Sequence, residues 1–382
     1  MRSVRSKVRG TVVLLALLAM TSFMWMGCES NQNPQTPEVQ EFVLVQSNPQ
    51  VQNVMEIQLR HTDELMAKEG IVGTATGLTE DGKPAVLILT EFDIVENALA
   101  KGMAKPVPDE LEGIPTRVYV TGKIRALKGK PGGGGGGGGT DHKAIQTPPI
   151  ELGTSGGWGD DLANGYCCGG TLGSLIQSGG KQYILSNYHV FESDIVNGGN
   201  GTTATTGDAI IQPGLIDIGC NVNNSQTVAT LVKSSSLPGS NVDAAIAEVA
   251  PGMVKSDGSI LEIGTLSSST VAAAIGQKVK KSGRTTGLTR SSIDGLNATV
   301  SVTYDNECAG GTAFTKTFTG QIVIKNRGSK FLAGGDSGSL MVEDVSNNPH
   351  AVGLLFAGSS TTAIANPINE VLNFFNASMV GN

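Results

Sequence analysis

Three polar residues in the C-terminal half have side chains that together could perform nucleophilic catalysis. His189 ends the apolar stretch "YILSNYHV", Asp243 begins "DAAIAEV", and Ser337 lies within "GGDSGSL". A serine hydroxyl becomes a strong nucleophile when an imidazole accepts its proton. A buried carboxylate on the other ring nitrogen holds that imidazole in the required tautomer. The residue types therefore predict Ser337 as nucleophile, His189 as general base and Asp243 as the group that orients the base.

The glycines around Ser337 suit the same chemistry. They remove side chains from the turn, so that the backbone N–H groups of Gly335 and Ser337 can face a reacting carbonyl and stabilise the negative charge that develops on it. Each candidate also fits an ordinary structural role: a histidine at a strand end, an aspartate at a strand start and a serine in a turn. The combination of all three in one chain favours catalysis.

The elements that must position these residues are predicted to be strands. From about residue 150 to 376, short apolar runs are separated by Gly, Asn, Ser and Thr, which is typical of a β-sandwich or β-barrel. Only "NPINEVLNFFNA" has the period of a helix in this region, and we expect a terminal helix there. The expected class is therefore an all-β C-terminal domain.

Five segments of this region resemble the motifs of chymotrypsin-fold (trypsin-like) serine peptidases. They are "LSNYHV", "VDAAIAEV", "KKSGRTTGLT", "GGDSGSL" and "AVGLLFAGS", in the order of the family. The resemblance covers about residues 165–372 and implies a pair of six-stranded β-barrels with the site in the cleft between them. It also implies hydrolysis of polypeptides through an acyl-enzyme, with no cofactor and no metal.

The resemblance implies a specificity pocket formed by Phe331, Phe356 and Gly358. Phe331 stands where trypsin-type pockets have an acid, so a preference for Lys or Arg is not expected. Phe356 and Ala357 replace the usual Ser-Trp pair of the pocket strand. Val190 stands where many relatives have a cysteine beside the histidine, so that disulfide is absent. We expect a small or apolar substrate residue before the bond that is cut.

Asp336 has its own role in the family. In relatives that are activated by cleavage, this aspartate pairs with the new N-terminus and thereby holds the oxyanion loop open. No arginine-rich activation site stands between the glycine run and Cys167 here. We therefore expect Asp336 to be satisfied by internal partners, and any maturation cut to fall within residues 129–150.

The N-terminus is predicted to be a targeting segment, residues 1–27. A basic stretch precedes the apolar run "TVVLLALLAMTSFMWMG", which is typical of an export signal. The run ends at Gly27-Cys28 and resembles a bacterial lipoprotein signal, although Trp25 stands where an aliphatic residue is usual. We expect a lipid on Cys28 and a location outside the cytoplasm, anchored to the cell envelope; an ordinary cleaved signal peptide is the alternative.

The remaining cysteines and the charge add two constraints. An exported chain with Cys167, Cys168, Cys220 and Cys308 can form two disulfides, although adjacent Cys167 and Cys168 are not expected to pair with each other. Buried free thiols are the alternative, and no histidine lies at zinc-site spacing from these cysteines. The formal net charge of −7 and the absence of a basic tract beyond the N-terminus argue against a nucleic-acid partner.

Residues 28–43 are polar and are predicted to be a tether, and residues 44–128 a small α+β domain of order α-β-β-α-β. Its expected elements are a helix that closes on Gly70, two strands around "EDGK", a helix in "EFDIVENALAKG" and a strand in "IPTRVYVTGKIRAL". This leading segment resembles the narrow-leaf-type subgroup of these peptidases. Residues 129–149, with eight consecutive glycines, are expected to be a flexible linker in which His142 has no chemical role. Residues 150–382 complete the chain as the peptidase domain.

An exported serine endopeptidase is therefore the leading functional hypothesis. The alternative is a catalytically inactive, peptidase-like binding or scaffold protein at the cell envelope, which would not require all three of His189, Asp243 and Ser337. A further hypothesis concerns residues 44–128, which could act as a pro-segment that assists folding of a slow, β-rich domain.

Overall fold

The computed structural model describes residues 43–101, 107–127, 129, 140–163, 166–192, 204–304 and 314–382. Residues 41–382 form one compact unit by their contacts. The predicted signal peptide, Cys28, nearly all of the tether and the run Gly132–Gly139 lie outside the described residues. Of the helices that the structure describes, none is long and apolar enough to cross a membrane.

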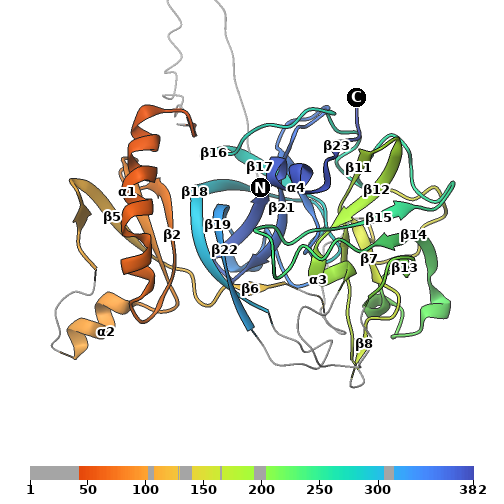
Figure 1. Ribbon diagram of the computed structural model, residues 1–382, viewed down its shortest axis with the longest axis horizontal. Helices are drawn as coiled ribbons and strands as arrows, with labels where there is room; N and C mark the ends of the chain where they lie inside the picture. Colours follow the sequence, from red (N-terminus) through yellow and green to blue (C-terminus); the bar gives the residue numbers. More distant parts are fainter. Residues whose placement is uncertain are drawn as a thin grey trace, which may run out of the picture. The chain divides into compact units, whose positions relative to one another are not determined.

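The first half of the β region folds into a closed barrel (Figure 1). Its sheet has the order β10-β7-β13-β14-β15-β12-β11-β23, and only Gly173 separates β10 from β11 along the chain. Because these two strands are one bent stretch of chain, the described strands close a six-membered ring. The strands are β7 (Thr154–Trp158), β10 (Gly170–Leu172), β11 (Ser174–Ser178), β12 (Lys181–Ser186), β13 (Ala209–Gln212), β14 (Gln226–Val232) and β15 (Ala245–Val249), with β23 (Ser378–Met379) on the edge of β11.

The second half closes in the same way. The order β17-β20-β21-β22-β19-β18 returns to its start because β17 also pairs with β18, so the described strands again form a ring of six. These strands are β17 (Lys278–Lys281), β18 (Thr289–Tyr304), β19 (Phe314–Lys325), β20 (Leu340–Glu343), β21 (Ala351–Gly358) and β22 (Thr362–Pro367). The predicted pair of six-stranded barrels is confirmed, as is the terminal helix α4 (Ile368–Phe375).

The N-terminal α+β unit has the predicted order of elements. It contains α1 (Pro49–Met66), β2 (Ile71–Leu78), β3 (Pro84–Thr90), α2 (Ile94–Ala100), β4 (Glu110–Leu111) and β5 (Ile114–Val120). Helix α1 begins after Asn48, whose side chain caps it by accepting from the N–H of Gln50. The helix ends before Gly70, the residue predicted as its cap; Gly70 has φ +82° and lies in the turn to β2.

Short elements complete the described chain. They are β1 (Leu44–Val45), β6 (Arg125–Ala126), β8 (Leu162–Ala163), β9 (Tyr166–Cys167), α3 (Tyr188–Phe191), β16 (Ala274–Ile275) and the 3₁₀ turns Leu215–Asp217, Val222–Asn224 and Arg327–Ser329.

The α+β unit is joined to the second barrel by continuous hydrogen bonding, which the sequence did not predict. β18 is 16 residues long and extends past the barrel to pair with β2, as can be followed in Figure 1. β1 pairs with β16, and Leu87, Leu89 and Phe318 belong to one buried apolar cluster. The domain boundary predicted near residue 128 remains a prediction, but the sheet and the core both cross it.

The segment after the glycine run is packed rather than flexible where the structure describes it. The His142 ring is buried, its Nδ1 lies 2.9 Å from the carbonyl oxygen of Gly153, and its Nε2 lies 2.6 Å from Glu262 Oε2. The expectation that His142 belongs to a flexible linker is therefore wrong. Two hydrogen bonds and burial fix this histidine against the first barrel.

The junction between β2 and β18 gives a test. A Cβ added to Gly73 would stand 2.7 Å from the carbonyl oxygen of Thr299 on β18, whereas one added to Gly239 would meet nothing within 4 Å. We expect Gly73→Ala to lower the free energy of unfolding by about 1–3 kcal/mol through overpacking. Gly239→Ala should stay within about 0.5 kcal/mol. Equal values for the two variants in urea titrations would contradict the joined sheet.

Candidate active site

The first barrel brings His189 and Asp243 together. Helix α3, which contains His189, directly follows β12, while Asp243 lies just before β15; β12 pairs with β15 so that Ser186 is opposite Ala245. His189 Nδ1 lies 2.7 Å from Asp243 Oδ2, and both side chains are buried. An Nδ1–H donated to the carboxylate leaves Nε2 as the proton acceptor, which is the tautomer that a general base requires.

Two residues of the second barrel are hydrogen-bonded to Asp243. The Tyr304 hydroxyl donates to Asp243 Oδ2 at 2.8 Å, and the N–H of Asp243 donates to Asn366 Oδ1 at 2.9 Å. Burial raises the pKa of Tyr304 well above its ordinary value, and the charge and hydrogen bond of Asp243 raise it further. Tyr304 therefore remains a donor at neutral pH. The sequence alone does not identify this residue, because a tyrosine at the end of a strand has no diagnostic spacing.

The turn around Ser337 needs its glycines. Gly335 has φ +96° and Gly338 has φ +92°. A Cβ on Gly335 would lie 2.5 Å from Thr285 Oγ1, and one on Gly338 would lie 2.2 Å from Ser186 Oγ. Left-handed φ values and this crowding together explain why glycines flank the serine.

Thr171 of the first barrel holds this turn in place. Its hydroxyl donates to the carbonyl oxygen of Gly335 and its N–H to that of Ser337, both at 2.9 Å. The N–H of Gly335, one of the two predicted oxyanion donors, donates to the carbonyl oxygen of Leu127 at 2.8 Å. The turn is thus attached to both barrels and presents its backbone to a neighbouring segment of the chain.

Asp336 is satisfied by internal partners, as expected. Its carboxylate accepts from the N–H groups of Thr285 (2.8 Å) and Thr286 (3.1 Å) and from that of Ala333 (3.0 Å). The Lys281 ammonium lies 3.4 Å from Asp336 Oδ2, and neither side chain is exposed. Burial lowers the pKa of Lys281, and the charge of Asp336 opposes that shift. The segment "KKSGRTTGLT" therefore supplies all of these partners except Ala333.

The nucleophile and the base are not hydrogen-bonded to each other. Ser337 Oγ donates to the carbonyl oxygen of Phe356 at 3.2 Å, and His189 Nε2 is buried with no hydrogen-bond partner among the described residues. Val190, which follows the base, and the carbonyl group of Ser337 both lie close to Gly170, because a Cβ there would meet Val190 Cγ2 at 2.6 Å and the Ser337 carbonyl oxygen at 2.9 Å. Hydrogen bonds of free catalytic sites are often long and tighten when substrate binds.

Of the three residues predicted to form the pocket, Phe331 and Gly358 lie near Leu127, whereas the Phe356 ring packs into the core. Phe356 is fully buried and its ring packs against Phe318 with 5.0 Å between centroids, so only its backbone is placed to meet a ligand. Phe331 is buried in a cluster on which Leu127 packs. Gly358 lies beside the same leucine, since a Cβ on it would stand 3.2 Å from Leu127 Cδ1.

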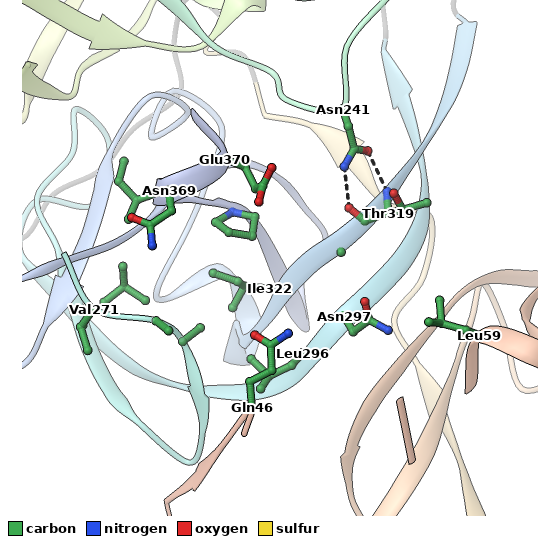
Figure 2. A pocket seen from close by; sticks show the side chains of 16 residues that line it. Gln46, Leu59, Asn241, Val271, Leu296, Asn297, Thr319, Ile322, Asn369 and Glu370 are labelled. Carbon is green, nitrogen blue, oxygen red and sulfur yellow. Dashed lines mark hydrogen bonds between the residues drawn. The ribbon is translucent and has the colours of Figure 1, made fainter. Parts of the chain in front are cut away.

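Two further features of the described ranges concern possible binding sites. No group of three His, Cys, Asp or Glu side chains is placed there to hold a metal ion. A cavity of about 430 Å³ is lined in part by Asn241 and Thr319. Two hydrogen bonds join these residues (Figure 2). Leu59 and Glu370 are among the residues that line the cavity, and His189, Asp243 and Ser337 are not. This cavity is therefore distinct from the candidate active site.

One disulfide is fully described. Cys167 is bonded to Cys220, and Ile211 and Leu215 pack around them. Cys168 is also disulfide-bonded, and Cys308 lies outside the described residues. The expectation that Cys167 and Cys168 would not pair with each other is confirmed.

One family model and several solved structures are similar to parts of this chain. The family model described as the Nal1 C-terminal domain matches residues 239–366, a stretch that includes Asp243 and Ser337 but not His189. The search of curated proteins finds no match.

Similar solved structures are proteases of low sequence identity. A glutamic acid specific serine protease is 19% identical with a TM-score of 0.38, covering 60% of this chain and 100% of its own. Cellulomonas bogoriensis chymotrypsin is 20% identical with a TM-score of 0.38, covering 61% and 99%. The MamO protease domain from Magnetospirillum magneticum is 11% identical with a TM-score of 0.32, covering 59% and 95%.

The buried pair beneath the nucleophile turn can be tested by removing its cation. Lys281→Met leaves the Asp336 carboxylate buried without a counter-charge, so we expect the free energy of unfolding to fall by about 3–5 kcal/mol. Lys278→Met, on the exposed end of the same strand, should change it by less than about 0.5 kcal/mol. Chemical denaturation measures both, and a Lys281 variant as stable as its control would show that the pair does not support the turn.

The contact between Tyr304 and Asp243 predicts an alkaline dependence of stability. The pKa of Tyr304 is raised in the folded protein, so its contribution is complete below the ordinary tyrosine value of about 10 and is lost as pH rises above it. Across that range, the unfolding free energy of the wild type should fall more steeply with pH than that of Tyr304→Phe. Parallel pH profiles would argue against a buried, un-ionised Tyr304.

Proposed function

We propose that this protein is a serine endopeptidase that hydrolyses polypeptides through an acyl-enzyme. The observation that carries the proposal is the hydrogen bond of 2.7 Å between His189 Nδ1 and Asp243 Oδ2, with Nε2 buried and without a partner among the described residues. This arrangement leaves the imidazole able to accept one proton from a nearby hydroxyl. The proposed nucleophile is Ser337, on the turn that Thr171 attaches to the first barrel.

In the proposed mechanism each residue has one role. Ser337 Oγ attacks the carbonyl carbon of the substrate while His189 Nε2 takes its proton, and Asp243 stabilises the imidazolium that forms. The N–H groups of Gly335 and Ser337 are the proposed donors to the oxyanion, a kind of interaction worth about 3–4 kcal/mol. His189 then protonates the leaving amine, and water releases the acyl group from Ser337.

The proposed compartment is outside the cytoplasm. The disulfide between Cys167 and Cys220 supports it, because disulfides form and persist in oxidising compartments. A lipid on Cys28 as the anchor, and membership of the narrow-leaf-type subgroup, remain part of the proposal. The match of residues 239–366 to the Nal1 C-terminal domain supports the second of these.

A second candidate is an inactive, peptidase-like binding or scaffold protein. It is favoured by one observation: Ser337 Oγ donates to the carbonyl oxygen of Phe356 at 3.2 Å instead of to His189. Polypeptide binding alone would require neither the buried carboxylate nor the imidazole tautomer. We therefore rank this candidate below the enzyme.

Covalent labelling separates the two candidates. A fluorophosphonate probe should label the folded wild type on prolonged exposure, because the activated serine displaces fluoride, and should leave Ser337→Ala unlabelled. Ser256→Ala, at an exposed serine outside the candidate site, is the matched control and should label like the wild type. Asp243→Asn should lose about 10⁴ in turnover of a denatured polypeptide, because the histidine loses the carboxylate that orients it.

The binding protein would give a different result. If neither the wild type nor Ser337→Ala is labelled although both are folded by circular dichroism, the second candidate is favoured. Equal labelling of wild type and Ser337→Ala would remove Ser337 as the nucleophile.

A further inference from the structure

We propose that the first substrate of this enzyme is its own chain, which is cut after Leu127; this inference rests on the proposed function. The segment from Ile124 to Leu127, together with Gly129, crosses the candidate active site. It bonds to the N–H of Gly335, the expected oxyanion donor, and pairs with the pocket strand β21. The proposed cut lies just before residues 129–150, where the sequence predicts any maturation cut to fall.

The backbone of this segment is bound as an added strand. β6 pairs antiparallel with β21, so that Ala126 is opposite Ala357 and Arg125 is opposite Gly358. The N–H of Leu127 donates to the carbonyl oxygen of Phe356 at 3.2 Å. An extended peptide on the edge of a sheet is a common mode of peptide recognition, in which main-chain bonds give affinity and pockets give specificity.

The register places one carbonyl group at the nucleophile turn. The carbonyl oxygen of Leu127 accepts from the N–H of Gly335 at 2.8 Å, and this N–H is a predicted oxyanion donor. Ser337, the other predicted donor and the proposed nucleophile, is two residues further along the same turn. Its hydroxyl donates to the carbonyl oxygen of Phe356, which also accepts from the N–H of Leu127. Among the carbonyls of this segment, that of Leu127 is therefore the one presented for attack.

The Leu127 side chain lies where the pocket was predicted. It packs on the cluster that contains Phe331, and its Cδ1 would stand 3.2 Å from a Cβ on Gly358. The expected preference was for a small or apolar residue before the cut, and leucine is apolar. The chain thus supplies a matching residue in register with its own pocket.

The chain is also held beyond the carbonyl. The N–H of Gly129 donates to the carbonyl oxygen of Gly169 at 3.0 Å, and a Cβ on Gly129 would stand 3.0 Å from the Cα of Gly335. Leu127 and Gly129 are therefore both hydrogen-bonded to the chain around the nucleophile turn. Such positioning of the reacting groups lowers the barrier of an intramolecular reaction.

The reaction conserves atoms and charge. Ser337 Oγ bonds to the Leu127 carbonyl carbon and its proton passes to His189 Nε2. The C–N bond to the next residue breaks when His189 returns that proton to the leaving nitrogen, which becomes a new N-terminus. A water molecule then gives its hydroxyl to the acyl carbon and its proton to His189, the ester bond to Ser337 Oγ breaks, and His189 passes the proton to that oxygen. Leu127 ends as a carboxylate and Ser337 is restored.

The two fragments should stay together after the cut. β2 pairs with β18, β1 pairs with β16, and β6 pairs with both β18 and β21, so these pairings cross the cut in space without depending on the broken bond. The protein should run as two bands under denaturing conditions and as a single species in gel filtration. Dissociation of the N-terminal fragment would break the pairing of β2 with β18 and give two species in gel filtration, which would contradict this expectation.

The test follows the termini of purified full-length chains by intact mass and N-terminal sequencing. Wild type should show a new N-terminus at residue 128, and Ser337→Ala should remain uncut. Leu127→Pro removes the N–H that bonds to Phe356 and should also remain uncut, whereas the conservative Leu127→Met should be cut. The fluorophosphonate probe, applied to Leu127→Pro, reports on Ser337 independently of the segment.

The outcomes separate the two proposals. A cut after Leu127 in wild type and Leu127→Met, absent from the other two variants, supports self-cleavage. An uncut wild type together with a labelled Leu127→Pro overturns self-cleavage and leaves the peptidase standing. An uncut wild type with a folded but unlabelled Leu127→Pro overturns both, and a cut that persists in Ser337→Ala overturns self-cleavage in favour of another protease.

Discussion

The buried carboxylate of Asp243 is the interaction that joins the two barrels at the candidate site. The first barrel supplies the aspartate and His189, and the second supplies Tyr304, which donates to the same oxygen. A buried charge is costly unless it is hydrogen-bonded. Separation of the barrels would remove the hydrogen bond from Tyr304 to this carboxylate and is therefore unfavourable. Orientation of the imidazole and association of the barrels are therefore two results of one network.

The nucleophile turn depends on a second buried charge. Asp336 is held by Lys281 and by the N–H groups of Thr285 and Thr286, all from one segment of the chain. The turn thus has its shape without a newly formed N-terminus. Control of this site, if self-cleavage occurs, would act through the segment that lies on the turn and not through the turn itself.

The sequence predicted the parts of this account that depend on local pattern. Short apolar runs predicted a β-sandwich or β-barrel, the resemblance to chymotrypsin-fold peptidases implied two barrels, and the types of His189, Asp243 and Ser337 indicated the chemistry. Tyr304 and Leu127 were not predicted, because their roles come from contacts between segments far apart in the chain: the hydrogen bond of Tyr304 to Asp243 of the first barrel, and the pairing of β6 with β21. His142 was assigned to a linker from the neighbouring glycines, whereas its burial depends on Glu262 and Gly153.

A crystal structure of full-length Ser337→Ala would test the central claim most directly, since that variant retains every contact except the serine hydroxyl. The account predicts His189 Nδ1 at hydrogen-bond distance from Asp243, as in the 2.7 Å contact here, with the carbonyl oxygen of Leu127 on the N–H of Gly335. A rotated imidazole that faces away from Asp243, or a cleft from which residues 125–127 are absent, would contradict it.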